Sequence, residues 1–166
     1  EIHERLVGSE MCIETVADVY ARRIVGWACA MAVNTQELPL QALEQAISWA
    51  ASRGGADGLI RHSGHGTQYT GTVYTTRVMG YGMLPSTGTV GDSYDNAMAE
   101  SADGAYRTEL VWRRKPFADL KGLELATFRW VRGGDSKRLH QSLGYRTPEA
   151  VETEYHANQA AQAASL

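Results

Sequence analysis

The spacing of apolar residues predicts alternating strands and helices along the first half of the chain. Residues 11–19 and 24–31 are rich in apolar and β-branched residues and are separated by a short polar stretch, which is typical of an antiparallel hairpin. Over residues 36–53 the apolar positions recur at helical spacing, and a pair of glycines follows. A short strand over 58–62 and a helix over about 67–79 complete this half.

The second half of the chain predicts one more short strand and three helices. The strand falls at about 83–86, and a helix is expected within 89–112. Residues 119–132 are amphipathic, and we expect Gly133–Gly134 to end that helix, because each interior glycine costs about 1 kcal/mol. The last helix begins near Pro148, a residue favoured in the first turn. This order predicts an α/β fold of the ribonuclease-H-like kind, a mixed sheet with flanking helices.

Composition places the chain among globular proteins. It has 166 residues, of which 43% are hydrophobic and 21% charged. No apolar run approaches the roughly 18–20 residues that span a bilayer, so we expect no membrane partner. Cys12 and Cys29 fit no metal-binding spacing and lie among apolar residues. Reduced cysteines of this kind predict a cytoplasmic protein.

Charge is distributed unevenly along the chain. Residues 106–146 contain ten Lys or Arg and four Asp or Glu, a net charge of +6, whereas the remaining residues carry −9 within the total of −3. A basic stretch beside an acidic body suits a polyanionic partner that approaches a metal-binding centre. An ordinary solvated helix face explains the same pattern, so charge alone leaves both readings open.

Three sequence segments carry an unusual combination of residues. They are GLIRHSGHGTQYT (58–70), PSTGTVGDSYDNAMAES (85–101) and RLHQSLGYRTPEAVE (138–152). Together they resemble the integrase-core (DDE, retroviral-integrase-like) transposases of bacterial insertion sequences, of the frameshift type whose second reading frame encodes the catalytic domain. The likeness runs from about residue 11 to residue 155.

The resemblance implies a Mg²⁺-dependent (or Mn²⁺-dependent) DNA strand transferase with three carboxylate ligands. Two cations stabilise the attacking and leaving oxygens of such a reaction, and Mg²⁺ prefers hard oxygen ligands. On the family pattern Glu100 is the glutamate, and the second aspartate position is Gly64. Glu100 lies 36 positions after Gly64, the spacing that this family keeps. The ligand position is present, but its carboxylate is missing.

The first aspartate of the pattern falls at about Glu1 when the sequence is counted back without gaps. Glu1 is either a longer carboxylate in the right place or simply the first residue of a fragment. We assign residues 1–112 to the integrase core, with a truncated or degenerate first strand, and 113–166 to a short basic helical extension. Asp18 is expected in the hairpin turn.

No other residue replaces the missing aspartate convincingly. Asp57 lies across the strand, about 20 Å away at 3.3 Å per residue. Asp92 and Asp95 suit the start of a helix better than a metal site. His62 and His65 are plausible ligands for Zn²⁺ or Mn²⁺ but poor ones for Mg²⁺, and loop packing explains them equally well.

Two functional hypotheses follow for this chain. The first is a transposase core that joins insertion-sequence ends to target DNA, impaired by Gly64, and working as a homo-oligomer as the resemblance implies. The second is a catalytically inactive remnant that still binds DNA or transposase subunits. The residues expected to contact nucleic acid are basic side chains of the C-terminal region: Arg113, Arg114, Lys115, Lys137, Arg138 and His140.

Overall fold

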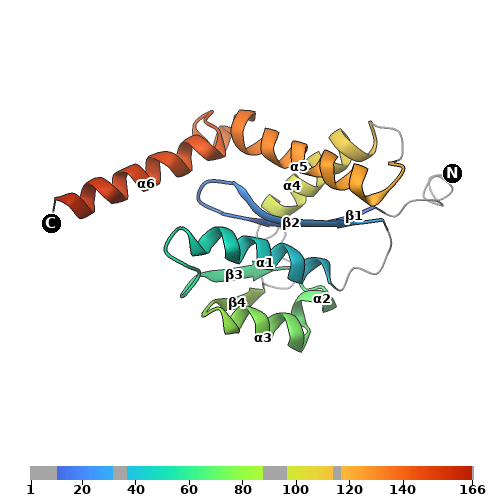
Figure 1. Ribbon diagram of the computed structural model, residues 1–166, viewed down its shortest axis with the longest axis horizontal. Coiled ribbons are helices and arrows are strands. Elements are labelled where there is room, and N and C mark those ends of the chain that lie inside the picture. Colours follow the sequence, from blue (N-terminus) through green and yellow to red (C-terminus); the bar gives the residue numbers. More distant parts are fainter. Residues whose placement is uncertain (1–10, 32–36, 88–96, 114–116, 166) are drawn as a thin grey trace.

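A computed structural model describes residues 11–31, 37–87, 97–113 and 117–165. They form a mixed α/β structure with two two-stranded sheets, as Figure 1 shows. This arrangement confirms the predicted α/β class. Within the described residues no helix combines the length and the apolar character that a membrane crossing requires.

The predicted hairpin forms at the beginning of the described chain. Strand β1 (Cys12–Ala17) pairs with β2 (Ile24–Ala30) in antiparallel fashion. The Asp18 carboxylate accepts hydrogen bonds from the backbone N–H groups of Tyr20 and Ala21. The expectation that Asp18 belongs to the turn is thus confirmed, and the side chain stabilises the reversal in the way typical of aspartate.

Helix α1 (Leu38–Ala51) packs against the hairpin through a close backbone contact. A Cβ atom at Gly26 of β2 would lie 2.0 Å from the backbone oxygen of Ala42, so only glycine allows this approach. Val16, Ala42 and Ala46 form part of the buried cluster between the helix and the hairpin. In Figure 1 α1 lies between the hairpin and the remaining two strands.

Those strands, β3 (Ile60–Ser63) and β4 (Leu84–Thr87), are parallel neighbours. The connection between them contains α2 (Thr67–Thr70) and α3 (Thr72–Gly80), where the sequence predicts one helix. The break lies at Gly71, whose backbone is extended (φ −64°, ψ 146°). The crossover therefore holds two shorter helices in place of the single one expected.

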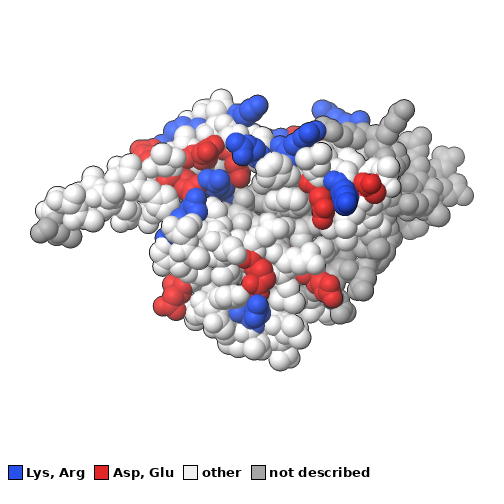
Figure 2. Space-filling view, viewed as in Figure 1, with Lys and Arg blue, Asp and Glu red and all other residues white. Residues whose placement is uncertain are grey.

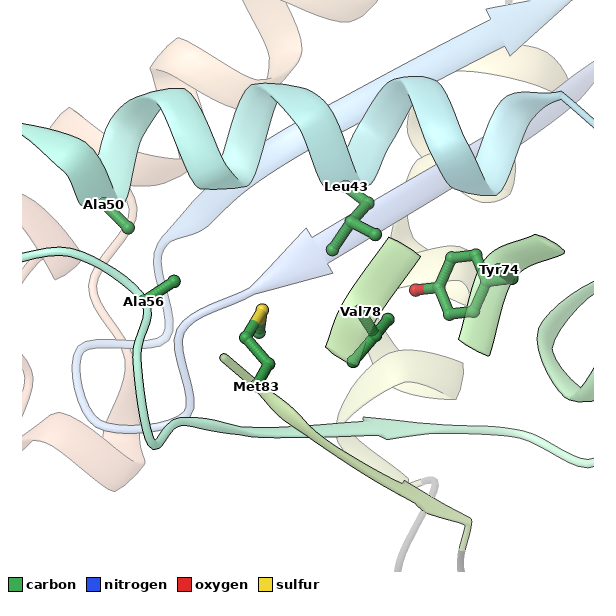
Figure 3. Packing of buried hydrophobic residues seen from close by; sticks show 6 residues of the cluster. All are labelled: Leu43, Ala50, Ala56, Tyr74, Val78 and Met83. Atoms are coloured by element: carbon green, nitrogen blue, oxygen red, sulfur yellow. The ribbon is translucent and has the colours of Figure 1, made fainter. Parts of the chain in front are cut away.

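The largest buried cluster joins α1 to this crossover. Figure 3 shows Leu43 of α1 facing Tyr74 and Val78 of α3, with Met83 on the side of Val78 away from Tyr74. Leu43 and Val78 are fully buried. Burying such side chains contributes roughly 1.5–3 kcal/mol each, so the cluster fixes the β3–β4 unit against α1.

The C-terminal half is helical. Helix α4 (Ala97–Tyr106) continues into the π-helical turn η1 (Arg107–Val111), and α5 (Leu120–Lys137) packs against β2 and η1. A short 3₁₀ turn, η2 (Gln141–Leu143), precedes α6 (Pro148–Ala164), which extends away from the rest of the structure in Figure 1. The boundary after residue 112 stays a prediction.

The prediction that Gly133–Gly134 ends a helix is wrong, because α5 runs through both glycines. Asp135, immediately beyond them, is buried and accepts a hydrogen bond from the Ile24 N–H at 3.1 Å. Arg23 lies 3.7 Å from the same carboxylate. These tertiary contacts offset the helix-propensity cost of about 1 kcal/mol per glycine.

Candidate functional site

A cavity of about 1270 Å³, here called the central cavity, lies between the hairpin and β3. Residues 14–18 of the hairpin and residues 59–64 at β3 line it on two sides. Helices α1 and α4 contribute further lining residues. The carboxyl end of β3, where the sequence places the aspartate position, thus opens into a space that α4 also borders.

Gly64 lines the central cavity directly after β3. A Cβ atom built there would meet no atom of the described residues within 4 Å, and the backbone at Gly64 does not have a positive φ. The backbone therefore has no need of glycine at this position. Asp57 lies against Gly82, at the other end of β3, which agrees with its predicted distance from the site.

Glu100 is exposed in the first turn of α4. Ala97 and Ser101 of the same helix line the central cavity, whereas Glu100 is not among the residues that line it. Glu1 lies outside the described residues, as do Asp92 and Asp95. Of the three predicted ligand positions, the structure describes Gly64 and Glu100 only.

The two histidines of the loop differ in their surroundings. His62 Nδ1 lies 3.4 Å from Ser86 Oγ of β4, and its buried Nε2 atom has no hydrogen-bond partner among the described residues. His65 is exposed. Among the residues that the structure describes, no group of three or more His, Cys, Asp or Glu side chains could hold a metal ion. A histidine-based metal site therefore receives no support from the geometry.

Two half-buried side-chain hydrogen bonds around β1 and β3 were not predicted from the sequence. Tyr69 of α2 donates its hydroxyl hydrogen to Glu14 of β1 at 2.5 Å, and Arg61 Nε donates to the Tyr74 hydroxyl at 3.0 Å. Burial raises the pKa of Glu14, although the hydrogen bond from Tyr69 partly offsets this increase. A carboxylate inside the apolar strand 12–17 is the sequence signal that could have revealed the contact.

Glu14 and Tyr69 connect the hairpin to the short helix that follows the Gly64 loop. Tyr69 also packs edge-on against Tyr74, with ring centroids 5.7 Å apart. The loop between β3 and α2 is therefore anchored at its far end by a hydrogen bond and a ring contact. Such contacts restrict the positions that a ligand at residue 64 could take.

The predicted nucleic-acid contacts fall into three groups. Arg113 and Lys137 are exposed, whereas Arg114 and Lys115 lie outside the described residues. Figure 2 shows basic side chains mainly over the upper part of this face, with acidic ones among them. The face in view is mixed, and the exposed cations remain accessible to a polyanion.

Arg138 and His140 are more constrained. Arg138 forms an ion pair with Glu109 and lies over the Trp130 ring, 5.6 Å from its centroid. Burial lowers the pKa of His140, and the nearby charges of Arg138 and Arg22 lower it further. Arg22 was not singled out in the sequence, yet it lines the central cavity with both residues. Three cationic or titratable groups therefore meet at one end of the cavity.

Comparisons with known proteins agree with this arrangement. Residues 81–148 match the family model of the integrase core domain. The chain is 42% identical over 152 residues to the transposase assigned to insertion sequence element IS986/IS6110 of Mycobacterium tuberculosis, and 41% identical over 143 residues to the transposase of IS629 from Shigella sonnei. These matches cover 90% and 86% of this chain but 54% and 46% of the relatives, so it spans about half their length.

The fold is also similar to that of a solved structure. The HTLV-2 integrase catalytic core domain, determined in complex with magnesium in a trimeric form, aligns over 86% of this chain and 92% of its own. The TM-score is 0.57 at 13% sequence identity. This likeness confirms the predicted ribonuclease-H-like fold. With the sequence matches, it shows that the chain belongs to the integrase-core transposases of bacterial insertion sequences.

Proposed function

We propose that this chain is the catalytic core of a transposase that acts on DNA, and that its metal site is impaired at Gly64. The observation that carries the proposal is the position of Gly64. It follows β3 and lines the central cavity, to which other residues of the Glu100-bearing helix α4 also contribute. A residue in this place can contribute a carboxylate to a site shared with α4, and glycine contributes none.

The donor set does not fit a site for two Mg²⁺ ions. Mg²⁺ requires hard oxygen ligands in near-octahedral geometry, and among the predicted ligand positions that are described only Glu100 offers a carboxylate. Removing one ligand also removes a negative charge from a centre that holds dications. We therefore expect weak metal binding and a strand-transfer rate lowered by orders of magnitude.

The backbone conformation at residue 64 does not require a glycine. The backbone at residue 64 has no positive φ, and no atom of the described residues lies within 4 Å of a Cβ placed there, so the described structure tolerates a side chain at this position. The glycine therefore has no evident role in the fold. DNA ends and target DNA are the proposed substrates, and self-association is expected by analogy with the trimeric HTLV-2 core.

A strand-transfer assay on insertion-sequence ends tests the proposal. The unmodified chain, Gly64→Asp and Gly64→Ala are compared in Mg²⁺ and in Mn²⁺. Only Gly64→Asp should gain activity, by about ten-fold or more, because Gly64→Ala adds the Cβ atom without a ligand. Strong activity of the unmodified chain that Glu100→Gln abolishes would show that the site is intact and the proposal wrong.

The alternative function is a binding module that has lost its chemistry. The exposed Arg113 and Lys137 favour it, since neither is needed for a buried contact and both are accessible to phosphate groups. DNA binding that persists without strand transfer, in the unmodified chain and in Gly64→Asp alike, would favour this function over an impaired enzyme.

A further inference from the structure

Trp112, the residue directly after the π-helical turn η1, is exposed in a way that the other tryptophans of this chain are not. It is 71% exposed, whereas Trp27, Trp49 and Trp130 are at least partly buried. Tryptophan side chains are highly buried on average in folded proteins. Among the described residues of 97–113 no other large apolar side chain is exposed, so Trp112 is not part of an apolar patch on this helix.

The turn η1 determines which way Trp112 faces. The Trp112 N–H donates to the carbonyl oxygen of Arg107, five residues earlier, at 2.8 Å. At about 3.6 residues per turn, an α-helix would instead place residue 112 about 140° around the axis from Arg107. The wider turn brings Trp112 back toward the side of Arg107, and π-turns inside helices are frequent at functional sites.

This side of the helix, here called the outer stripe, carries Glu100, Arg107 and Trp112, all of them exposed. Glu100 and Arg107 lie two helical turns apart on one face. The opposite side is held against α5, because the hydroxyl groups of Tyr106 and Thr127 lie 2.8 Å apart in a buried hydrogen bond. The packing against α5 therefore keeps the outer stripe facing away from the core.

The charge next to Trp112 favours a nucleic acid over an apolar protein surface. Arg113 is exposed, and the sequence continues with Arg114 and Lys115. The core of a protein–protein interface is depleted of charged residues. Surfaces that bind single-stranded nucleic acids instead combine aromatic rings, on which bases stack, with cations that follow the phosphates.

We propose that Trp112 is a stacking platform for an unpaired base of DNA, and that Arg113 contacts the phosphate next to that base. Trp112 lies 12 residues after Glu100. At about 1.5 Å per residue this is about 18 Å along the helix, the length of about five base pairs. DNA that follows the outer stripe from Glu100 therefore reaches Trp112. The inference takes DNA as the partner from the proposed function and adds an unpaired base to the substrate, without involving Gly64 or a metal.

Two DNA probes separate base stacking from phosphate binding. Each is a duplex with a five-nucleotide single-stranded overhang, normal in one probe and abasic in the other, so both carry the same phosphates. Fluorescence anisotropy should show that the unmodified chain binds the normal probe about ten-fold more tightly, because only its bases can stack. Trp112→Ala should remove this difference, whereas Trp112→Phe should retain most of it, because phenylalanine still offers a ring face.

Two further variants serve as controls. Arg113→Ala should weaken the binding of both probes to the same extent, because it removes a phosphate contact that both probes offer. Val73→Ala, on α3, removes another apolar side chain of a residue that is 71% exposed, and it should change neither affinity.

Equal binding of the two probes by the unmodified chain, or an equal loss on both probes in Trp112→Ala, would overturn the stacking platform. A changed sedimentation coefficient of Trp112→Ala with unchanged DNA affinity would also overturn it, because Trp112 would then be a protein contact. If the chain binds duplex DNA while giving these results, the proposed function stands and only this inference fails. A chain that binds neither probe overturns the proposed DNA partner as well.

Discussion

Asp135 shows how a single buried carboxyl group can hold distant parts of this molecule together. It accepts the Ile24 N–H of the hairpin, and Arg23 lies beside it. Arg23 also pairs with Glu152 of α6. Burial raises the pKa of Asp135 from 3.8 to about 6, and the hydrogen bond from Ile24 and the charge of Arg23 only partly oppose this effect.

This raised pKa predicts how stability changes with pH. An acid whose pKa is higher in the folded state favours folding below its unfolded pKa, and that contribution is lost as pH rises through the folded pKa. Relative to Asp135→Asn, the unmodified chain should therefore lose up to about 3 kcal/mol of unfolding free energy between pH 4 and pH 7, at 1.36 kcal/mol per pKa unit.

Urea unfolding at several pH values measures this difference. Asp135→Asn retains an oxygen that can accept the Ile24 hydrogen bond, so the comparison isolates the titration. Asp103→Asn, at a more exposed carboxylate on α4, serves as the matched control. A pH-independent difference between the unmodified chain and Asp135→Asn would mean that Asp135 is not titrating in this range.

At the scale of elements, helix α5 extends beyond the end that the sequence predicts for it. The two glycines lie inside the helix, and a Cβ atom at either position would meet no atom of the other described segments within 4 Å. Gly144, in the loop before α6, has a positive φ of 65° and differs in this respect. Glycines of these two kinds should respond oppositely to alanine.

We expect Gly133→Ala and Gly134→Ala each to stabilise the chain by about 1 kcal/mol, because alanine is the better helix former and no clash arises. Gly144→Ala should destabilise it by about 1 kcal/mol, because L-residues disfavour the left-handed region. Thermal unfolding measures all three variants. Destabilisation by alanine at both helix positions would restore the original expectation that α5 ends there.

The remaining elements show which signals in a sequence are reliable. The hairpin, α1 and α6 were predictable because apolar periodicity, turn residues and Pro148 all act locally. The continuation of α5 through its two glycines is accompanied by contacts with distant segments, such as that of Asp135 with Ile24. Local propensity contains no information about such partners, so this feature emerged only in three dimensions.

At the scale of the whole molecule, the sequence predicts the site residues, and the structure adds the contacts around them. The spacing between Gly64 and Glu100 matches the family pattern, and residues of both segments line one cavity. The Glu14–Tyr69 hydrogen bond joins residues 55 positions apart and could not be read from spacing. The prediction for Arg138 was also incomplete, because its ion pair with Glu109 is seen only in the three-dimensional structure.

The run of basic residues 113–115 predicts a salt-dependent affinity for DNA. The triple substitution of Arg113, Arg114 and Lys115 by alanine should weaken binding and lower the slope of log affinity against log salt by up to about 3, at about 0.9 per phosphate contact. Arg77→Ala, on α3, is a control that should change neither. An unchanged slope after the triple substitution would remove these residues from the interface.

The central claim is that residue 64 is a metal-ligand position whose ligand is absent, and Mn²⁺ affinity measured by electron paramagnetic resonance tests it most directly. The account predicts weak binding by the unmodified chain and by Gly64→Ala, and binding tighter by about ten-fold or more in Gly64→Asp. Adding Glu100→Gln to Gly64→Asp should return the affinity to that of the unmodified chain. Equal Mn²⁺ affinity of the unmodified chain and Gly64→Asp, abolished in both by Glu100→Gln, would contradict the account.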